Sequence, residues 1–319
     1  MNRPYFVFEV TPRCGSDCLY CYNVWKQRDD YPEGELTFSA ITRLFEKLLS
    51  EVRPSGVTLA GGEPLLHPHI AKISTFLSGK NIPVSVVTNG TILDEETAGN
   101  LADAGVGHFE ISIPSMDRFS YAKLTRDERL GEARKALLCT RSAGSKLTVS
   151  TVITRLNLID IGEVIELAAA FSADSVSLNR FVPGGEGLRH LSELTPTRDD
   201  LEQVLAAADA KSADLGIPVA VTIPVEPCLI DHKQFPRLHF GACSCGKDKW
   251  VIDPLGNLRT CEQNPEILGS LFLKSFADLA GSARTESFRN DGLNVGCGEC
   301  DLYENCGGGC RFLRRSGTK

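Results

Sequence analysis

Residues 5–21 read YFVFEVTPRCGSDCLYC, a β-rich run followed directly by Cys14, Cys18 and Cys21. Thiolates hold iron-sulfur clusters, and three of them can bind three irons of a four-iron cubane while the last iron has no protein ligand. Such an iron can chelate a small molecule and pass it an electron. A zinc knuckle is the alternative, but it needs a further cysteine or histidine nearby, and none lies between Asn23 and Val57.

Outward from this stretch, β-rich runs alternate with amphipathic helical segments as far as residue 223, which predicts βα units around a parallel sheet. The clearest helix has apolar residues at helical spacing from Ile41 to Leu49, with Ser39 as its expected N-cap. A further helix is expected at Thr197–Leu215. Six units are too few for a closed eight-stranded barrel, so we expect an α/β fold with a partial (β/α)6 TIM-like barrel, working at its strand carboxyl ends. The six expected strands are Tyr5–Val10, Val57–Ala60, Val84–Thr88, Phe109–Ile113, Leu147–Ile153 and Val176–Val182.

Composition narrows the class of protein. The 319 residues are 42% hydrophobic, and 34 basic against 41 acidic residues give a net charge of -7. This balance provides no basic surface for nucleic acid or for an anionic membrane, so neither is an expected partner. There is no apolar run of membrane-spanning length and no signal-peptide layout, which predicts a cytoplasmic protein.

Twelve cysteines are many for a cytoplasmic chain, where disulfides are rare, so they favour metal ligation. Cys139 lies on an apolar, helical stretch and is expected to be a buried small hydrophobe. Eight cysteines follow residue 227 in a loop-rich stretch with little core of its own, which would need metal staples. We therefore expect two domains, 1–223 and 224–319. The eight are Cys228, Cys243, Cys245, Cys261, Cys297, Cys300, Cys306 and Cys310.

The first cysteine spacing, with Tyr20 before its last member, resembles the signature of the radical S-adenosylmethionine superfamily. The resemblance implies that S-adenosylmethionine binds the open iron of one 4Fe-4S cluster and is cleaved to a 5'-deoxyadenosyl radical, with Tyr20 beside the adenine. It also implies that Gly61-Gly62-Glu63-Pro64, after the second strand, binds the methionine amino group. A bare turn is the other interpretation of that motif.

Further strand ends carry the same resemblance. Asn89, in Thr88-Asn89-Gly90, ends the third strand, and Ser112 ends the fourth and matches a serine that often contacts the ribose. Pro114 stands where the family frequently has an aspartate. Residues around Ile153 and Arg155 close the fifth strand, and NRFVPGG at 179–185 closes the sixth. Either Arg155 or Arg180 can pair with the methionine carboxylate, and either can equally form a structural ion pair.

The last cysteines, Cys297-x2-Cys300-x5-Cys306-x3-Cys310, follow Cys243-x12-Gly256-x4-Cys261. Together they resemble a SPASM domain, which carries auxiliary iron-sulfur clusters in many peptide-modifying radical enzymes. A zinc ribbon is the alternative. Relatives commonly carry one more cysteine well after this run, whereas this chain stops nine residues after Cys310. The eight thiolates counted from Cys228 would complete two auxiliary 4Fe-4S clusters. The hypothesis gives Cys243, Cys261 and Cys310 to the nearer cluster and Cys297, Cys300 and Cys306 to the farther one, with Cys228 and Cys245 in the remaining positions, their assignment open.

The resemblance implies hydrogen abstraction from a substrate, and auxiliary clusters that accept an electron favour a net oxidation. The substrate it implies first is a ribosomally made peptide, oxidised with formation of a crosslink. Only four residues precede Tyr5, so we expect a separate leader-binding protein or direct capture of the peptide. Flavodoxin or ferredoxin is the expected reductant. The alternatives are dehydrogenation of a small alcohol or aminocyclitol, and a non-catalytic electron-transfer or zinc-binding protein.

Overall fold

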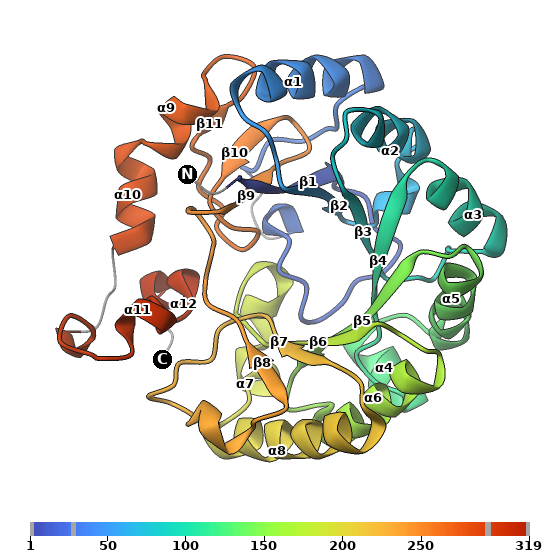
Figure 1. Cartoon of the computed structure of the whole chain (residues 1–319), viewed down its shortest axis with the longest axis vertical. Coiled ribbons are helices and arrows are strands. Elements are labelled where there is room, and N and C mark those ends of the chain that lie inside the picture. Colours follow the sequence, from blue (N-terminus) through green and yellow to red (C-terminus); the bar gives the residue numbers. More distant parts are fainter. Residues whose placement is uncertain (1–2, 27–29, 291–294, 317–319) are drawn as a thin grey trace.

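The computed structural model describes residues 3–26, 30–290 and 295–316. Within them, eleven strands form one sheet in the order β11-β10-β9-β1-β2-β3-β4-β5-β6-β7-β8 (Figure 1). Neighbours from β9 to β8 are parallel, and β10 and β11 continue the sheet antiparallel beyond β9. The strands are β1 (Tyr5–Thr11), β2 (Gly56–Gly61), β3 (Val84–Thr88), β4 (Val106–Ser112), β5 (Lys146–Ile153), β6 (Ser175–Arg180), β7 (Val219–Val221), β8 (Leu238–Phe240), β9 (Lys249–Ile252), β10 (Asn257–Arg259) and β11 (Gly269–Ser270).

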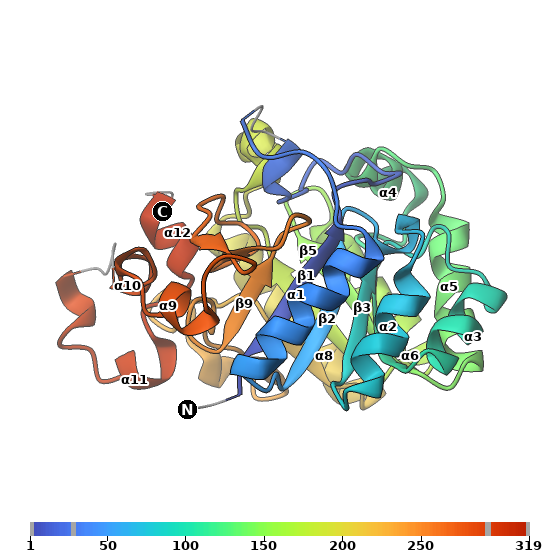
Figure 2. The ribbon, with the colours of Figure 1, turned by 90° about the horizontal axis from the view of Figure 1, so that it is seen from above.

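Helices surround the curved sheet on its outer side, and the last helices gather at the open side of the barrel (Figures 1 and 2). The helices are α1 (Phe38–Glu51), α2 (Ile70–Gly79), α3 (Glu95–Asp103), α4 (Arg118–Thr125), α5 (Leu130–Ser142), α6 (Ile161–Ala170), α7 (Leu191–Leu194), α8 (Arg198–Leu215), α9 (Phe276–Ala280), α10 (Ala283–Asn290), α11 (Tyr303–Cys306) and α12 (Arg311–Ser316). Short 3₁₀ helices are η1 (Val24–Lys26), η2 (Pro64–Leu66), η3 (Leu158–Asp160), η4 (Gly185–His190), η5 (His232–Gln234) and η6 (Val295–Cys297). Within the described ranges, no helix is both long and apolar enough to cross a membrane.

The core lies between the sheet and the outer helices. Phe6, Phe8 and Val10 alternate along β1 and are fully buried, because successive strand residues point to opposite faces. Phe8 packs edge-on against Phe45 of α1, with ring centroids 5.4 Å apart. The helical spacing from Ile41 predicted this packed face correctly. The cap was wrong: Thr37, not Ser39, accepts a hydrogen bond from the backbone N–H of Ala40 at 3.3 Å, and Ser39 lies inside the first turn.

The six predicted strands are confirmed as β1 to β6, in one continuous order, and the expected Thr197–Leu215 helix is α8. The sheet also extends beyond residue 223. β7 and β8 add three residues each after β6, and β9 pairs with β1 on its other side, with Tyr5 in register with Lys249. Phe276 packs against both Phe6 and Trp250, so apolar contacts join the carboxyl-terminal region to the barrel.

Candidate active site

A cavity of about 430 Å³ extends from the carboxyl ends of the barrel strands into the barrel; we call it the chamber. Strand-end residues such as Gly61, Thr88 and Ser112 line it, and Tyr5 and Thr58 reach it from within the barrel. Seven cysteines from both ends of the sequence open into this one space. They are Cys14, Cys18, Cys21, Cys243, Cys245, Cys261 and Cys310.

The loop after β1 carries the first three cysteines, all as free thiols. A hydrogen bond from the backbone N–H of Leu19 to the carbonyl of Leu124, at 2.8 Å, anchors this loop to α4. Burial raises the pKa of all three thiols, and raises that of Cys18 to about 12 with help from the neighbouring thiolates. A bound metal deprotonates its thiol ligands, so buried, mutually close thiols of this kind fit an iron-sulfur cluster.

Gly61 and Gly62 allow β2 to end in close contact with the cysteine loop. A Cβ on Gly62 would lie 2.1 Å from the carbonyl oxygen of Arg13, and one on Gly61 would lie 2.4 Å from that of Thr11. Gly61 has φ +135°, which side chains disfavour. The backbone N–H of Gly62 donates to Thr11 at 2.8 Å, and that of Glu63 donates to Arg13 at 2.7 Å. Both glycines are therefore needed for the loop to sit against the strand end.

The Glu63 carboxylate, 2% exposed, holds three neighbouring groups. It accepts hydrogen bonds from the Thr88 hydroxyl at 2.7 Å and from the backbone N–H groups of Asn89 and Leu65, at 2.9 and 3.2 Å. Burial raises its pKa, and these hydrogen bonds oppose the rise. Glu63 thereby fixes the end of β3 against the turn after β2, and it does not line the chamber.

Asn89 connects the end of β3 to the cysteine loop. Its Oδ1 accepts from the backbone N–H and the hydroxyl of Thr91, and its Nδ2 lies 3.5 Å from Ser16 Oγ. Ser16 in turn donates to Asp127 at 2.7 Å. Asp127 also pairs with Arg129 at 2.6 Å, and this hydrogen-bonded guanidinium lowers the pKa of Asp127 to about 2.

The other expected cofactor residues divide by location. Tyr20, Asn89, Ser112 and Arg180 line the chamber together with Gly61 and Gly62, whereas Pro64, Ile153 and Arg155 do not. Ile153 is 1% exposed among the core residues, and the Arg155 guanidinium donates to the carbonyl of Ser192 at 3.3 Å. Arg180 forms an ion pair with Glu226 at 2.8 Å.

Four later cysteines face the same chamber. The ligand atoms of Cys245, Cys261 and Glu262 all lie within 4.8 Å of one another. Cys243 packs against Cys245 and Cys261, and its thiol raises the pKa of Cys310 after the larger effect of burial. The four come from the loop before β9, the segment after β10 and the residue before α12, which the sheet and the last helix bring together.

A partly buried ion pair lies beside these thiols. Lys249 Nζ is 2.6 Å from Glu262 Oε1, and both residues line the chamber. Burial works against the charge on each, but their mutual attraction outweighs it, so the pKa of Lys249 is raised and that of Glu262 is lowered. Sequence analysis did not single out either residue, although Glu262 directly follows Cys261.

Cys297, Cys300 and Cys306 do not line the chamber. Cys228 is exposed overall. Partial burial of its thiol is the main cause that raises its pKa, and the nearby Glu226, Cys306 and Cys297 raise it further. Glu226 also accepts a hydrogen bond from the backbone N–H of Cys310 at 3.4 Å. The segment that carries Cys228 therefore lies against the turn between Cys306 and Cys310. Cys139 is 5% exposed on α5, which confirms its expected burial.

Glu110 is a further chamber residue that sequence analysis missed. It lies on β4 two residues before Ser112, so both side chains point to the same face of the strand. The alternation of side chains along the strand can be seen in the sequence, but it does not show which face of the strand lines a cavity.

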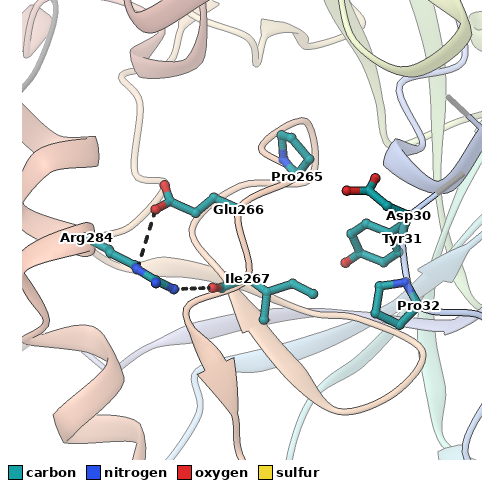
Figure 3. Close-up of a pocket in the computed structure, with 7 residues that line it drawn as sticks. All are labelled: Asp30, Tyr31, Pro32, Pro265, Glu266, Ile267 and Arg284. Carbon is teal, nitrogen blue, oxygen red and sulfur yellow. Dashed lines mark hydrogen bonds and ion pairs between the residues drawn. The ribbon is translucent and has the colours of Figure 1, made fainter. Parts of the chain in front are cut away.

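A smaller pocket of about 340 Å³ lies between the segment at Asp30–Pro32 and the segment at Pro265–Ile267 (Figure 3). Arg284 closes one side of it, where it lies 3.9 Å from Glu266 and donates to the carbonyl of Ile267 at 3.0 Å. None of the predicted site residues lines this pocket.

The sequence profile of the Radical SAM superfamily matches residues 8–168, which is just over half of the chain and includes the first three cysteines. The chain belongs to the radical SAM superfamily. Membership implies S-adenosylmethionine and one 4Fe-4S cluster as cofactors of this radical SAM enzyme.

Individual relatives extend the likeness over the whole radical SAM chain. A PqqA peptide cyclase of Gluconobacter oxydans is 27% identical over 317 residues, which are 95% of this chain and 84% of that protein. An AdoMet-dependent heme synthase of Methanosarcina barkeri is 24% identical over 99% of this chain and 94% of its own length.

Solved structures show the same fold. Streptococcus suis SuiB bound to S-adenosylmethionine matches with a TM-score of 0.76 and 16% identity, over 98% of this chain and 74% of that one. SuiB bound to its precursor peptide SuiA gives the same TM-score at 18% identity, over 98% and 73%. The expected α/β barrel with a cysteine-rich extension is thereby confirmed.

Proposed function

We propose that this radical SAM enzyme oxidises a ribosomally made peptide by hydrogen abstraction, with formation of a crosslink. The observation that carries the proposal is that Cys14, Cys18 and Cys21 share one chamber with four later cysteines. A substrate in the chamber is within reach of the radical source and of an electron acceptor. The PqqA peptide cyclase relative and the fold likeness to SuiB, which binds a precursor peptide, support a peptide substrate.

Bound S-adenosylmethionine and its cluster would supply the radical, and the residues of the chain bind, orient and enclose the reactants. We assign cofactor contacts to the residues that line the chamber near the first cysteines: Tyr20, Gly61, Gly62, Asn89 and Ser112. Glu63 fixes the backbone of Asn89 and Leu65 around them. Pro64, Ile153 and Arg155 shape the strand ends from outside the chamber, and Arg180 positions Glu226.

We further propose two auxiliary 4Fe-4S clusters, with the eight thiols divided by location. Cys243, Cys245, Cys261 and Cys310, which line the chamber, would hold the nearer cluster. Cys297, Cys300 and Cys306 would hold the farther one together with Cys228, whose thiol interacts with Cys297 and Cys306. Two complete sets of four thiolates favour iron-sulfur clusters over a single zinc ribbon.

The proposed division of labour follows the sequence. Residues 1–223 would carry the radical chemistry, and residues 224–319 the auxiliary clusters. A flavodoxin or ferredoxin would reduce the first cluster, and a separate leader-binding protein would deliver the peptide. The twelve free thiols suit the reducing cytoplasm.

Dehydrogenation of a small alcohol or aminocyclitol is the second candidate function. Hydroxyl and amide groups line the chamber, and Asn179 donates to Ser150 there at 3.1 Å. Such groups suit a polyhydroxylated ligand, and the relative named as a heme synthase is named for a non-peptide product.

The test uses anaerobically reconstituted enzyme with S-adenosylmethionine and a strong reductant. We expect about twelve irons per chain, formation of 5'-deoxyadenosine, and loss of two hydrogen atoms from a short peptide encoded beside the gene. Turnover of an aminocyclitol but of no peptide would favour the second candidate function. Failure to form 5'-deoxyadenosine would leave only an electron-transfer or zinc-binding role. The triple variant C14A/C18A/C21A should lose cleavage, whereas Cys139→Ala should keep it.

A further inference from the structure

Glu110 occupies a central position in the chamber wall. Its strand, β4, lies between β3 and β5, and Glu110 is in register with Val87 and Thr148. Phe109 and Ile111, on either side of it, are fully buried among the core residues on the other face. The Glu110 carboxylate is therefore fixed in direction by strand packing, and it faces the space in which a substrate would be held.

The charges that line the chamber are matched by partners, with Glu110 as the exception. Lys26 pairs with Asp17 at 3.2 Å, Arg180 with Glu226 at 2.8 Å, and Lys249 with Glu262 at 2.6 Å. Across residues 3–26, 30–290 and 295–316, the Glu110 carboxylate forms no hydrogen bond or ion pair.

The groups around Glu110 do not neutralise it. His108, one step along the same strand face, shares a hydrogen bond with Thr148 at 2.8 Å. Burial lowers the pKa of His108, although the Glu110 charge opposes this, so the imidazole is neutral near pH 7. Ser112, two residues further along β4, and Val87 and Ser150, on the adjoining strands β3 and β5, are uncharged.

We propose that Glu110 binds a cationic group of the substrate, either a protonated amine or a guanidinium. The inference rests on the proposed function and deepens it, because it names the chemistry of the group that enters the chamber. When a substrate displaces water, a carboxylate without a counter-charge loses its hydration, which is costly. A cation that donates charge-assisted hydrogen bonds offsets that loss, and a neutral apolar group does not.

The test measures binding of a probe cation, so it needs no knowledge of the natural substrate. Cluster-loaded enzyme saturated with S-adenosylmethionine is dialysed against radiolabelled n-butylguanidinium at about 0.15 M salt, which screens diffuse surface charge. We expect one bound equivalent, and at least tenfold weaker binding to Glu110→Gln. The control is Glu163→Gln, on the exposed face of α6 (Ile161–Ala170), which removes the same charge elsewhere and should bind as the parent does.

Competition in the parent enzyme provides a second measurement that needs no variant. n-Butylammonium should displace the probe, and 1-butanol at the same concentration should not. Equal competition by the alcohol, or unchanged probe binding by a folded Glu110→Gln, would overturn the proposal. So would a variant that loses affinity for S-adenosylmethionine while still binding the probe, because Glu110 would then serve the cofactor.

The outcomes separate this inference from the proposed function. Cation binding that depends on Glu110, without turnover of any peptide, would count against the peptide substrate alone. If a peptide is turned over, replacing its lysines and arginines one at a time by norleucine should slow the parent at one position and have little further effect on Glu110→Gln. Turnover indifferent to every such replacement would refute the cationic group and leave peptide oxidation standing.

Discussion

Arg180 and Glu226 form a two-point ion pair, with Nη1 2.8 Å from Oε2 and Nη2 3.1 Å from Oε1. Arg180 ends β6, and Glu226 accepts a hydrogen bond from the backbone N–H of Cys310. A Cβ on the adjacent Gly309 would lie 2.1 Å from Glu226 Oε1, so the carboxylate fills the space beside that turn. The pair therefore connects β6, the last long strand of the barrel, to the turn that carries Cys310.

Replacing Arg180 with methionine should leave Glu226 without its cation in a largely buried place. We expect the free energy of unfolding, measured by anaerobic urea titration of the cluster-loaded chain, to fall by about 2 kcal/mol. Arg198→Met breaks the exposed pair with Glu202 and should cost less than about 0.5 kcal/mol. Equal losses in the two variants would contradict a special role for the Arg180 pair.

Gly62→Ala should disturb the first cysteine loop, because the new Cβ meets backbone atoms of Arg13 that cannot move aside alone. Iron retained after gel filtration should fall by about four per chain, with loss of 5'-deoxyadenosine formation. Gly99→Ala, inside α3 (Glu95–Asp103) with open space around it, should keep its iron and gain about 0.5 kcal/mol. Full iron content in Gly62→Ala would show that the close contact is dispensable.

Acid should weaken the contact between Asp127 and the cysteine loop. The pKa of Asp127 is lowered from 3.8 to about 2, so its stabilising contribution is complete above pH 3.8 and is lost as pH falls toward 2. Asp127→Asn should remove about 1 kcal/mol from the free energy of unfolding near neutral pH and flatten its acid dependence. The exposed Asp103→Asn should retain the parent's dependence. Identical acid profiles for parent and Asp127→Asn would rule out this contribution.

Cys228→Ser should reduce iron from about twelve to about eight per chain while the first cluster still cleaves S-adenosylmethionine. The physical reason is the loss of one of four thiolates from the farther set. Iron analysis and electron paramagnetic resonance of the reduced protein report this directly, and Cys139→Ser is the matched control. If both variants keep the full complement, Cys228 is not a ligand.

Residue spacing was sufficient to predict six strands, and parallel strand ends meet at one edge, so the segments that follow them were expected to lie near one another. The roles of individual site residues came from the family resemblance and stay predictions. It could not predict β7 and β8, which are three residues long and show no alternation. Nor could it place β9 beside β1, since Tyr5 and Lys249 are far apart in sequence and no local pattern names a strand's partner. For a similar reason the sequence could not show that Glu110 lacks a cationic partner. That depends on Arg180 and Lys249 being paired with Glu226 and Glu262, which only the fold reveals.

The position of β1 between β2 and β9 also has a consequence for biosynthesis. The ribosome makes β1 first, yet its second neighbour emerges only when residues 249–252 have been translated. Until then the apolar sequence YFVFEV keeps one row of N–H and C=O groups open, a template for pairing with other nascent chains. Slow translation of the last third of the message should therefore lower the yield of soluble protein, even where every residue of the chamber is intact.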